Sequence, residues 1–149
     1  MLFRSLLSRS SLLPGRVYRV MTVSLTRYSV DTILPAFAQC LETLPNLHTL
    51  QVCHAHAVVK TALETAFNGK QYPQIRTIVL PSSAHNILRA CPRVAEVTCI
   101  EDDGDTLLAA ISAECRDVEV IDGFKFTNAM LERALIVAAG YRLLISVPR

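Results

Sequence analysis

The chain has 149 residues, 51% of them hydrophobic, and a formal net charge of +2. This length is enough for one domain with a sizeable core, and no apolar run reaches the roughly 18 to 20 residues that span a bilayer. The five cysteines are odd in number and lack CxxC spacing, which favours small buried thiols in a reducing compartment over disulfides or zinc ligands.

The N-terminal 30 residues contain five arginines and no acidic residue. Residues 1–13 are rich in arginine and serine, which is the composition of a mitochondrial transit peptide. Alternatively, this stretch is an internal helix of a longer protein, and it stands at the N-terminus because the gene model is shortened. The first repeat, which begins almost at once with Tyr18, supports this alternative. We therefore separate residues 1–16, a basic segment or capping helix, from residues 17–149, which we expect to form a repeat domain.

A short sequence pattern, which we call the phrase, recurs along the chain. It consists of an apolar residue, two variable residues, an apolar residue, one variable residue and another small or apolar residue, and it usually follows a proline. The clear copies are residues 45–52, 73–80, 92–99 and 116–123, and weaker copies lie at 18–23 and 142–147. The leading apolar residues Leu47, Ile75, Val94 and Val118 are separated by 28, 19 and 24 residues. Such intervals bracket the leucine-rich-repeat range of about 20 to 29 and indicate a solenoid.

Between these phrases, apolar residues recur every three or four positions, which predicts helices. The predicted helical runs are 33–44, 59–67, 87–91, 107–111 and 131–138. Gly69 is expected to close the second helix, and Ser82 or Ser83 and Asp105 are expected to cap later ones. The repeating unit is therefore a strand, a turn and a helix.

Consecutive strand–helix units with short links predict parallel strands, since each helix returns the chain to start the next strand beside the last one. In residues 47–52 apolar side chains alternate with polar ones, so one face of the sheet should be wet. This pattern favours an α/β fold, a short leucine-rich-repeat-like solenoid with strands on its concave face and helices on its convex face, over a doubly wound sheet. The residues at one position of the repeat should then lie side by side on adjacent strands. These residues are Leu50, Ile78, Val97 and Ile121.

Residues 44–50, 73–81, 91–94 and 118–121 together resemble the irregular leucine-rich-repeat region of fungal F-box-like proteins. The resemblance covers roughly residues 18–147, and its motifs are degenerate. In that family an N-terminal F-box docks a cullin-type ubiquitin ligase and the repeats hold the substrate. No F-box is recognisable in this sequence, so the resemblance implies the substrate-binding repeats of such an adaptor, with ubiquitin-ligase components as partners if a longer form carries the F-box.

The sequence departs from a regular leucine-rich repeat at the position of the asparagine ladder. Backbone groups at that turn must be satisfied in another way, and we expect Ser83, Thr26 and Asp102 to do so in part. The residues that replace the asparagine are Thr26, Ala55, Ser83, Asp102 and Phe126.

Candidate chemistry is sparse. Cys53, His54 and His56 could offer metal ligands, but their side chains should diverge and no second cluster completes a tetrahedral set. Residues 101–105 resemble a calcium loop in composition, although their spacing to a bidentate glutamate fails. No GxSxG, Walker or GxGxxG motif occurs. We therefore expect no cofactor, no metal and no catalysis, with a small mitochondrial or cytosolic α/β enzyme of unknown chemistry as the alternative.

The predicted concave face is neutral to acidic with apolar members, and residues 96–122 hold nine carboxylates and one base. This composition fits a protein partner better than a nucleic acid, which needs a basic, aromatic lining, and no membrane contact is expected. We predict a non-catalytic protein-interaction module in the cytoplasm or nucleus, with mitochondria as the alternative. A competing interpretation is that loops cover Ile100 and Phe124. The predicted partner-binding residues are Val79, Glu96, Thr98, Ile100, Val120, Asp122 and Phe124.

Overall fold

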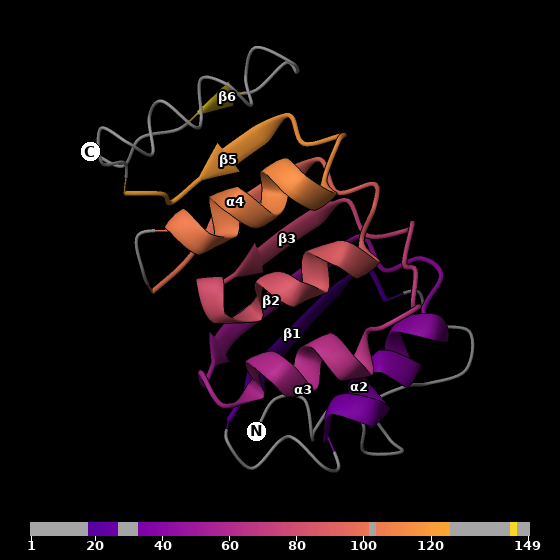
Figure 1. The fold of residues 1–149 in the computed structure, drawn as a ribbon. Coiled ribbons are helices and arrows are strands. Elements are labelled where there is room, and N and C mark those ends of the chain that lie inside the picture. The colour runs from indigo at the N-terminus through magenta and orange to yellow at the C-terminus, as the bar shows by residue number, and fades with distance from the viewer. Residues whose placement is uncertain (1–17, 27–32, 102–103, 126–143, 146–149) are drawn as a thin grey trace.

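The computed structural model describes residues 18–26, 33–101, 104–125 and 144–145 as an α/β fold with a single parallel sheet. The sheet has six strands in the order β1-β2-β3-β4-β5-β6, so that each strand lies beside the next one in the sequence (Figure 1). The strands are β1 (Val20–Leu25), β2 (Thr49–Ala55), β3 (Thr77–Leu80), β4 (Glu96–Cys99), β5 (Val120–Asp122) and β6 (Leu144–Ile145).

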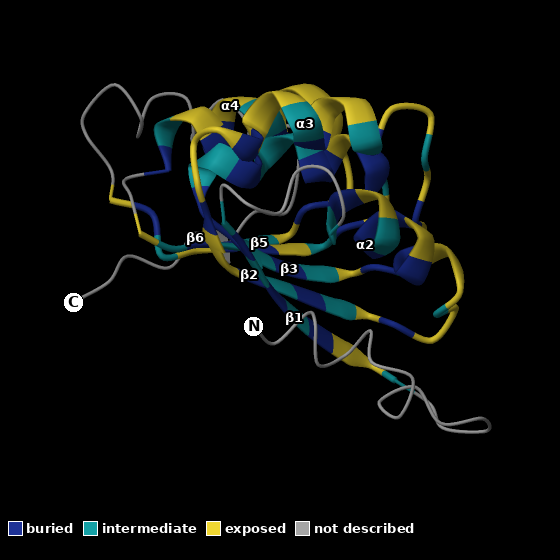
Figure 2. Cartoon of the chain, turned by 90° about the horizontal axis from the view of Figure 1, so that it is seen from below, coloured by how far each residue is buried: buried dark blue, intermediate teal, exposed yellow. Residues whose placement is uncertain are grey.

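Helices follow the strands as the alternating periodicity predicts. They are α2 (Ile33–Glu42), α3 (Val59–Ala66), the 3-10 helix η1 (Ser82–Ala90) and α4 (Asp105–Glu114). All four lie on the same face of the sheet (Figure 2), whereas a doubly wound sheet would have helices on both faces. None of them combines the length and the hydropathy that a membrane-spanning helix requires. The helix predicted over 131–138 and the N-terminal segment 1–16 lie outside the described residues.

The strand register confirms the predicted alignment of one repeat position. Leu50 pairs with Ile78, Ile78 with Val97, and Val97 with Ile121. Each of these four side chains is at most 1% exposed. The weaker copies of the phrase also form strands in this register, because Met21 pairs with Leu50 and Ile121 pairs with Ile145. From β1 to β5, a row of buried apolar side chains thus runs across the sheet on the side of the helices.

The core fills the space between this side of the sheet and the helices. At its α2–α3 end, the Phe67 ring makes edge contacts with Phe37 and Tyr72 at centroid distances of 5.6 and 5.8 Å. The Tyr72 hydroxyl donates a hydrogen bond to the Ala38 carbonyl at 3.0 Å, which satisfies the only polar atom of this buried aromatic side chain. Aromatic packing here joins two consecutive helices and the segment that leads to β3.

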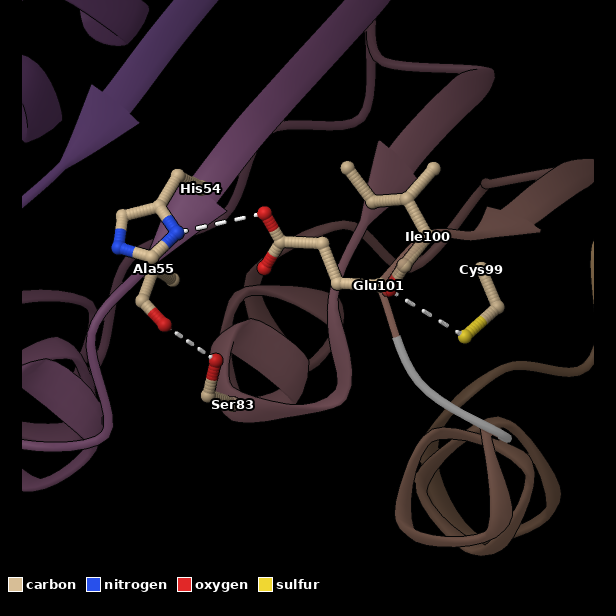
Figure 3. A network of polar contacts seen from close by, with 6 residues as sticks. All are labelled: His54, Ala55, Ser83, Cys99, Ile100 and Glu101. Carbon is tan, nitrogen blue, oxygen red and sulfur yellow. Dashed lines mark hydrogen bonds and ion pairs between the residues drawn. The ribbon is translucent and has the colours of Figure 1, made fainter.

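Side-chain hydrogen bonds to the backbone connect neighbouring strand–helix units at the N-terminal end of the sheet. Gln74 donates to the Leu41 carbonyl at 3.0 Å and Asn86 donates to the Lys60 carbonyl at 3.0 Å. Ser83, one of the residues that replace the ladder asparagine, donates to the carbonyl of Ala55 at 2.7 Å (Figure 3). The prediction for Ser83 is therefore confirmed: a hydroxyl satisfies a backbone acceptor that the preceding unit leaves at its turn.

The predicted helix ends are correct in one case and shifted in two. Gly69 follows α3 with φ of +73°, as expected for a residue that closes a helix in the left-handed region. Pro81, rather than Ser82 or Ser83, precedes η1, and Gly104, rather than Asp105, is the N-cap of α4. The Ser83 hydroxyl is instead used for the contact with Ala55, and Asp105 occupies the first turn of α4.

Candidate interaction surface

One face of the sheet lies away from the described helices (Figure 2). Two rows of residues in register run across it. Because successive residues of a strand point to opposite faces, this face carries the residues between the buried ones. The first row pairs in register through Val20, Thr49, Thr77, Glu96 and Val120, and the second through Thr22, Gln51, Val79, Thr98 and Asp122. We call these ten residues the open face.

Five of the ten open-face residues belong to the partner-binding set predicted from the sequence, namely Val79, Glu96, Thr98, Val120 and Asp122. Val79, Thr98 and Val120 are half-buried, while Glu96 and Asp122 are exposed. Register places Val79 beside Thr98, Thr98 beside Asp122, and Glu96 beside Val120. The structure therefore brings five of the seven predicted residues together on β3, β4 and β5, and half-buried Ile100 directly follows β4.

Phe124 does not belong to this surface, which corrects the sequence prediction. Its side chain is 0% exposed, and its ring lies against Gly104 at the start of α4, where a Cβ atom would be within 2.4 Å of it. The cause is Gly123, whose φ of +74° ends the alternation of β5. The chain turns at this glycine, and the next side chain enters the core instead of facing outward. Phe124 is therefore a core residue, and the competing interpretation was right in that this side chain is not available to a partner.

The only charged members of the open face are the carboxylates of Glu96 and Asp122. Their strands are neighbours, and neither residue takes part in the ion pairs of the described residues. Asp122 Oδ1 accepts a hydrogen bond from the Gly123 amide at 2.8 Å. At the opposite end, the hydroxyl of Thr22 donates to Gln51 Oε1 at 3.1 Å. The open face is thus neutral over β1 to β3 and negative over β4 and β5.

A second polar contact borders this face at the carboxyl ends of the strands. His54 Nδ1 lies 3.3 Å from Glu101 Oε1, and both side chains are about half exposed (Figure 3). A register shift after Val23 places His54, rather than Cys53, beside Ser24. This β-bulge changes the direction in which the histidine side chain points. Sequence reasoning missed this pair, because nothing in the residue pattern signals the bulge.

The cysteines and histidines do not assemble into a chemical site. His56 accepts a hydrogen bond from the Val58 amide at 3.2 Å, whereas His54 points towards Glu101. The two histidines therefore diverge, as the sequence analysis expected. Among the described residues, no three histidine, cysteine or carboxylate side chains are placed to hold a metal ion.

The thiols behave as core side chains, with one exception. Cys40, Cys91, Cys99 and Cys115 are buried and free, and Cys53 is free but exposed, which corrects the expectation of burial for that residue. Burial raises the pKa of the Cys115 thiol to about 12 and also raises the pKa of Cys91 and Cys40. Because only the thiolate is nucleophilic, these groups have no reactive form at neutral pH.

The helix side carries a shallow groove of about 260 Å³ between η1 and α4. Its polar groups already have partners within the chain. His85 Nδ1 contacts the Ser82 carbonyl at 2.8 Å, and Arg89 lies 3.6 Å from Glu114 and 3.9 Å from Glu64. These contacts join three consecutive helices, so the groove is explained by packing between units.

No protein-family model, curated protein or solved structure matches this chain significantly.

Proposed function

We propose that this chain is a non-catalytic protein-interaction module, a short leucine-rich-repeat-like solenoid that binds a protein partner on its open face. The observation that carries the proposal is the division of the sheet into two faces. One face holds the row Leu50, Ile78, Val97 and Ile121 under the helices, while the other presents two registered rows of half-exposed side chains. A parallel sheet usually has helices on both faces. Because the helices of the described residues all lie on one side of the sheet (Figure 2), these residues leave the other face to another molecule.

The chemistry of the open face supports a protein partner. Its members are mostly β-branched residues with hydroxyl or methyl groups, and its only charges are the carboxylates of Glu96 and Asp122. Such a face repels the phosphate backbone of a nucleic acid, which needs lysine or arginine. Half-exposed Val79 and Val120 supply apolar contacts that a protein segment can cover, and half-exposed Ile100 lies directly beyond them at the end of β4.

The sequence resemblance specifies this proposal further. In F-box-like proteins the repeats hold the substrate of a ubiquitin ligase, and the sequential strand order of this chain is compatible with such repeats. We propose that the open face has the substrate-holding role and that ubiquitin-ligase components associate only with a form that carries an F-box. The compartment proposed for this role is the cytoplasm or nucleus.

The experiment is affinity capture from cell extract with quantitative mass spectrometry, using the full chain and two arginine variants. The test variant Val79→Arg/Thr98→Arg places two cations in the middle of the open face. The control variant Ala109→Arg/Ala113→Arg places two cations on exposed positions of α4, on the helix side. Circular dichroism and urea unfolding verify that all three proteins are folded.

The proposal expects a partner that the wild type and the α4 variant enrich equally and that the open-face variant loses by about tenfold or more, as when hot-spot contacts are removed. Equal enrichment by all three proteins, or loss with the α4 variant alone, would contradict the proposal. If the open-face variant retains every protein that the wild type enriches, the function belongs to another surface.

A further inference from the structure

β1 is the first strand of the sheet, and among the described residues it pairs with β2 alone. Its other side is therefore an edge of the described sheet. At the opposite end, the described part of β6 has two residues, whereas β1 has six. A long edge strand presents a row of backbone donors and acceptors that can pair with another chain. Proteins commonly protect such an edge with charged residues or proline, and Val20–Leu25 contains neither.

Every second residue of β1 directs its backbone groups to this edge. The carbonyl groups of Arg19 and Leu25 point the other way, because they accept hydrogen bonds of 3.0 and 2.9 Å from amides in or next to β2. Buried and outward side chains alternate without a break along β1, and the extra residue of the bulge lies on β2. The direction of the backbone groups therefore alternates as well. The residues whose N–H and C=O groups face the edge are Val20, Thr22 and Ser24.

This edge is complementary to the same edge of a second copy. When two β1 strands run antiparallel with Thr22 opposite Thr22 of the second copy, Val20 lies opposite Ser24 of that copy. All the outward-facing residues then form hydrogen-bonded pairs, and each pair exchanges two N–H···O bonds. A shift of the register in either direction would pair one of these residues with a residue beyond the strand. The register centred on Thr22 therefore satisfies the most backbone groups.

The side chains on both faces are compatible with this register. On the helix side, Met21 lies opposite Val23 of the second copy, so the buried apolar row continues from one sheet into the other. On the open face, Val20, which is 54% exposed, gains a neighbour in Ser24 of the second copy. The exposed Arg19 precedes β1, and the antiparallel pairing places the two Arg19 residues about 20 Å apart at 3.3 Å per residue. This separation exceeds the Debye length of about 8 Å, so their repulsion is screened.

We propose that two copies of this chain associate by antiparallel pairing of their β1 strands about a two-fold axis through Thr22. The axis is perpendicular to the sheet, so the two sheets become one, with all described helices on one face and both open faces on the other. The contact is one strand pair about 20 Å long, well below the about 800 Å² per partner of a standard interface. The dimer is therefore reversible and forms at micromolar concentrations or above. It involves no other protein, so it stands or falls apart from the proposed function.

The first test is sedimentation velocity of the full chain and two variants at about 1 to 500 µM, a range that brackets micromolar association. Thr22→Pro removes the outward N–H at the centre of the pairing and leaves the hydrogen bonds to β2 in place, because this N–H does not face β2. Thr22→Val is the matched control. It loses the same hydroxyl contact with Gln51 but keeps the N–H. Circular dichroism and urea unfolding verify that all three proteins are folded.

The proposal expects the wild type and Thr22→Val to change from monomer to dimer as the concentration rises. Folded Thr22→Pro should dimerise at least about tenfold more weakly, since its edge lacks a central donor and carries a proline ring. A wild type that stays monomeric over the whole range would overturn the proposal. Dimerisation of folded Thr22→Pro with unchanged affinity would assign the contact to another surface, and assemblies larger than a dimer would exclude the closed two-fold arrangement.

Disulfide trapping tests the register and does not depend on the proline variant. Val20→Cys and Ser24→Cys are made in a Cys53→Ser background, which leaves only buried native thiols among the described residues, and oxidised glutathione is the oxidant. The register brings position 20 of one copy about 5.5 Å from position 24 of the other, within the range that a disulfide spans.

Two copies of the same variant instead hold their thiols about 13 Å apart, which is too far for a disulfide. We expect a mixture of the two variants to form at least about tenfold more cross-linked dimer than either variant alone. No cross-link in the mixture, or equal cross-linking in the mixture and in the single variants, would overturn the proposed pairing.

Discussion

His54 and Glu101 contact each other at 3.3 Å although a third strand lies between the strands that carry them. His54 is on β2 and Glu101 follows β4, while β3 ends at Leu80 before it reaches their level. The other ion pairs of the described residues join neighbouring units, as in the contacts of Arg89 with Glu64 and Glu114. Because β3 ends early, the C-terminal ends of β2 and β4 can contact each other through this pair.

Glu101 has a backbone conformation that is unusual for its residue type, with φ of +72°. A left-handed conformation costs a non-glycine residue about 1 to 2 kcal/mol. Glu101→Gly and Glu101→Ala both remove the contact with His54, so their difference isolates the backbone term. We expect Glu101→Gly to be about 1 kcal/mol more stable than Glu101→Ala in urea unfolding. Equal stabilities would mean that this residue is not held in the left-handed region.

Two glycines with nearly the same φ provide a matched test of the turn that buries Phe124. An added Cβ at Gly123 would lie 2.2 Å from the Cys99 carbonyl oxygen, whereas at Gly69 it would meet nothing within 4 Å. Gly69→Ala should cost about 1 to 2 kcal/mol from its conformation alone. Gly123→Ala should cost at least about 2 kcal/mol more, because backbone atoms must move. A calorimetric comparison in which the two variants unfold alike would contradict this geometry.

The register of the repeats makes a prediction about Leu50 and its neighbour Gln51. Leu50 is 0% exposed, so Leu50→Ala should cost about 2 to 5 kcal/mol through the cavity it leaves. Gln51 faces the open side and makes one hydrogen bond, with Thr22, so Gln51→Ala should cost no more than about 1 kcal/mol. Chemical denaturation of both variants measures the difference, and similar costs would mean that the two faces are wrongly assigned.

Burial of the thiols predicts a loss of stability at alkaline pH. The pKa of Cys115 is about 12 in the folded chain, against about 8.5 for an exposed thiol. Between these values the unfolded state has released a proton that the folded state keeps, so the free energy of unfolding falls as pH rises above about 8.5, by at most about 1.4 kcal/mol per pH unit for this group. Below that pH the contribution is fully present.

Urea midpoints at pH 7.5 and pH 10 measure this effect. The decrease should be smaller in Cys115→Ala than in the wild type. If Cys115→Ala lost as much stability as the wild type between the two pH values, the buried thiol would not be its source.

The strand register was predictable from the sequence, whereas the edges of the candidate site were not. Leu50, Ile78, Val97 and Ile121 recur at one position of the phrase, and burying them together fixes how the strands align. Phe124 was assigned outward because strict alternation was extended past Asp122. The left-handed conformation of Gly123 breaks that alternation. The sequence shows that a glycine is present, but it does not show which φ that glycine adopts.

The contact between His54 and Glu101 shows the other limit of the sequence. It depends on an extra residue, Cys53, in the ladder between β1 and β2 and on the early end of β3 at Leu80. Each is a property of two strands considered together. The prediction for Ser83 was successful because it needed only the turn position within one unit and a hydroxyl that could donate to Ala55.

The central claim, that the open face is the partner surface, is tested most directly by site-specific photo-crosslinking in living cells. A photoreactive amino acid is placed at Thr98, in the middle of the open face, or at exposed Ala109 on α4, and adducts are identified by mass spectrometry. We expect a discrete protein adduct from position 98 and none from position 109. Adducts from position 109 alone, or the same adducts from both positions, would contradict the claim.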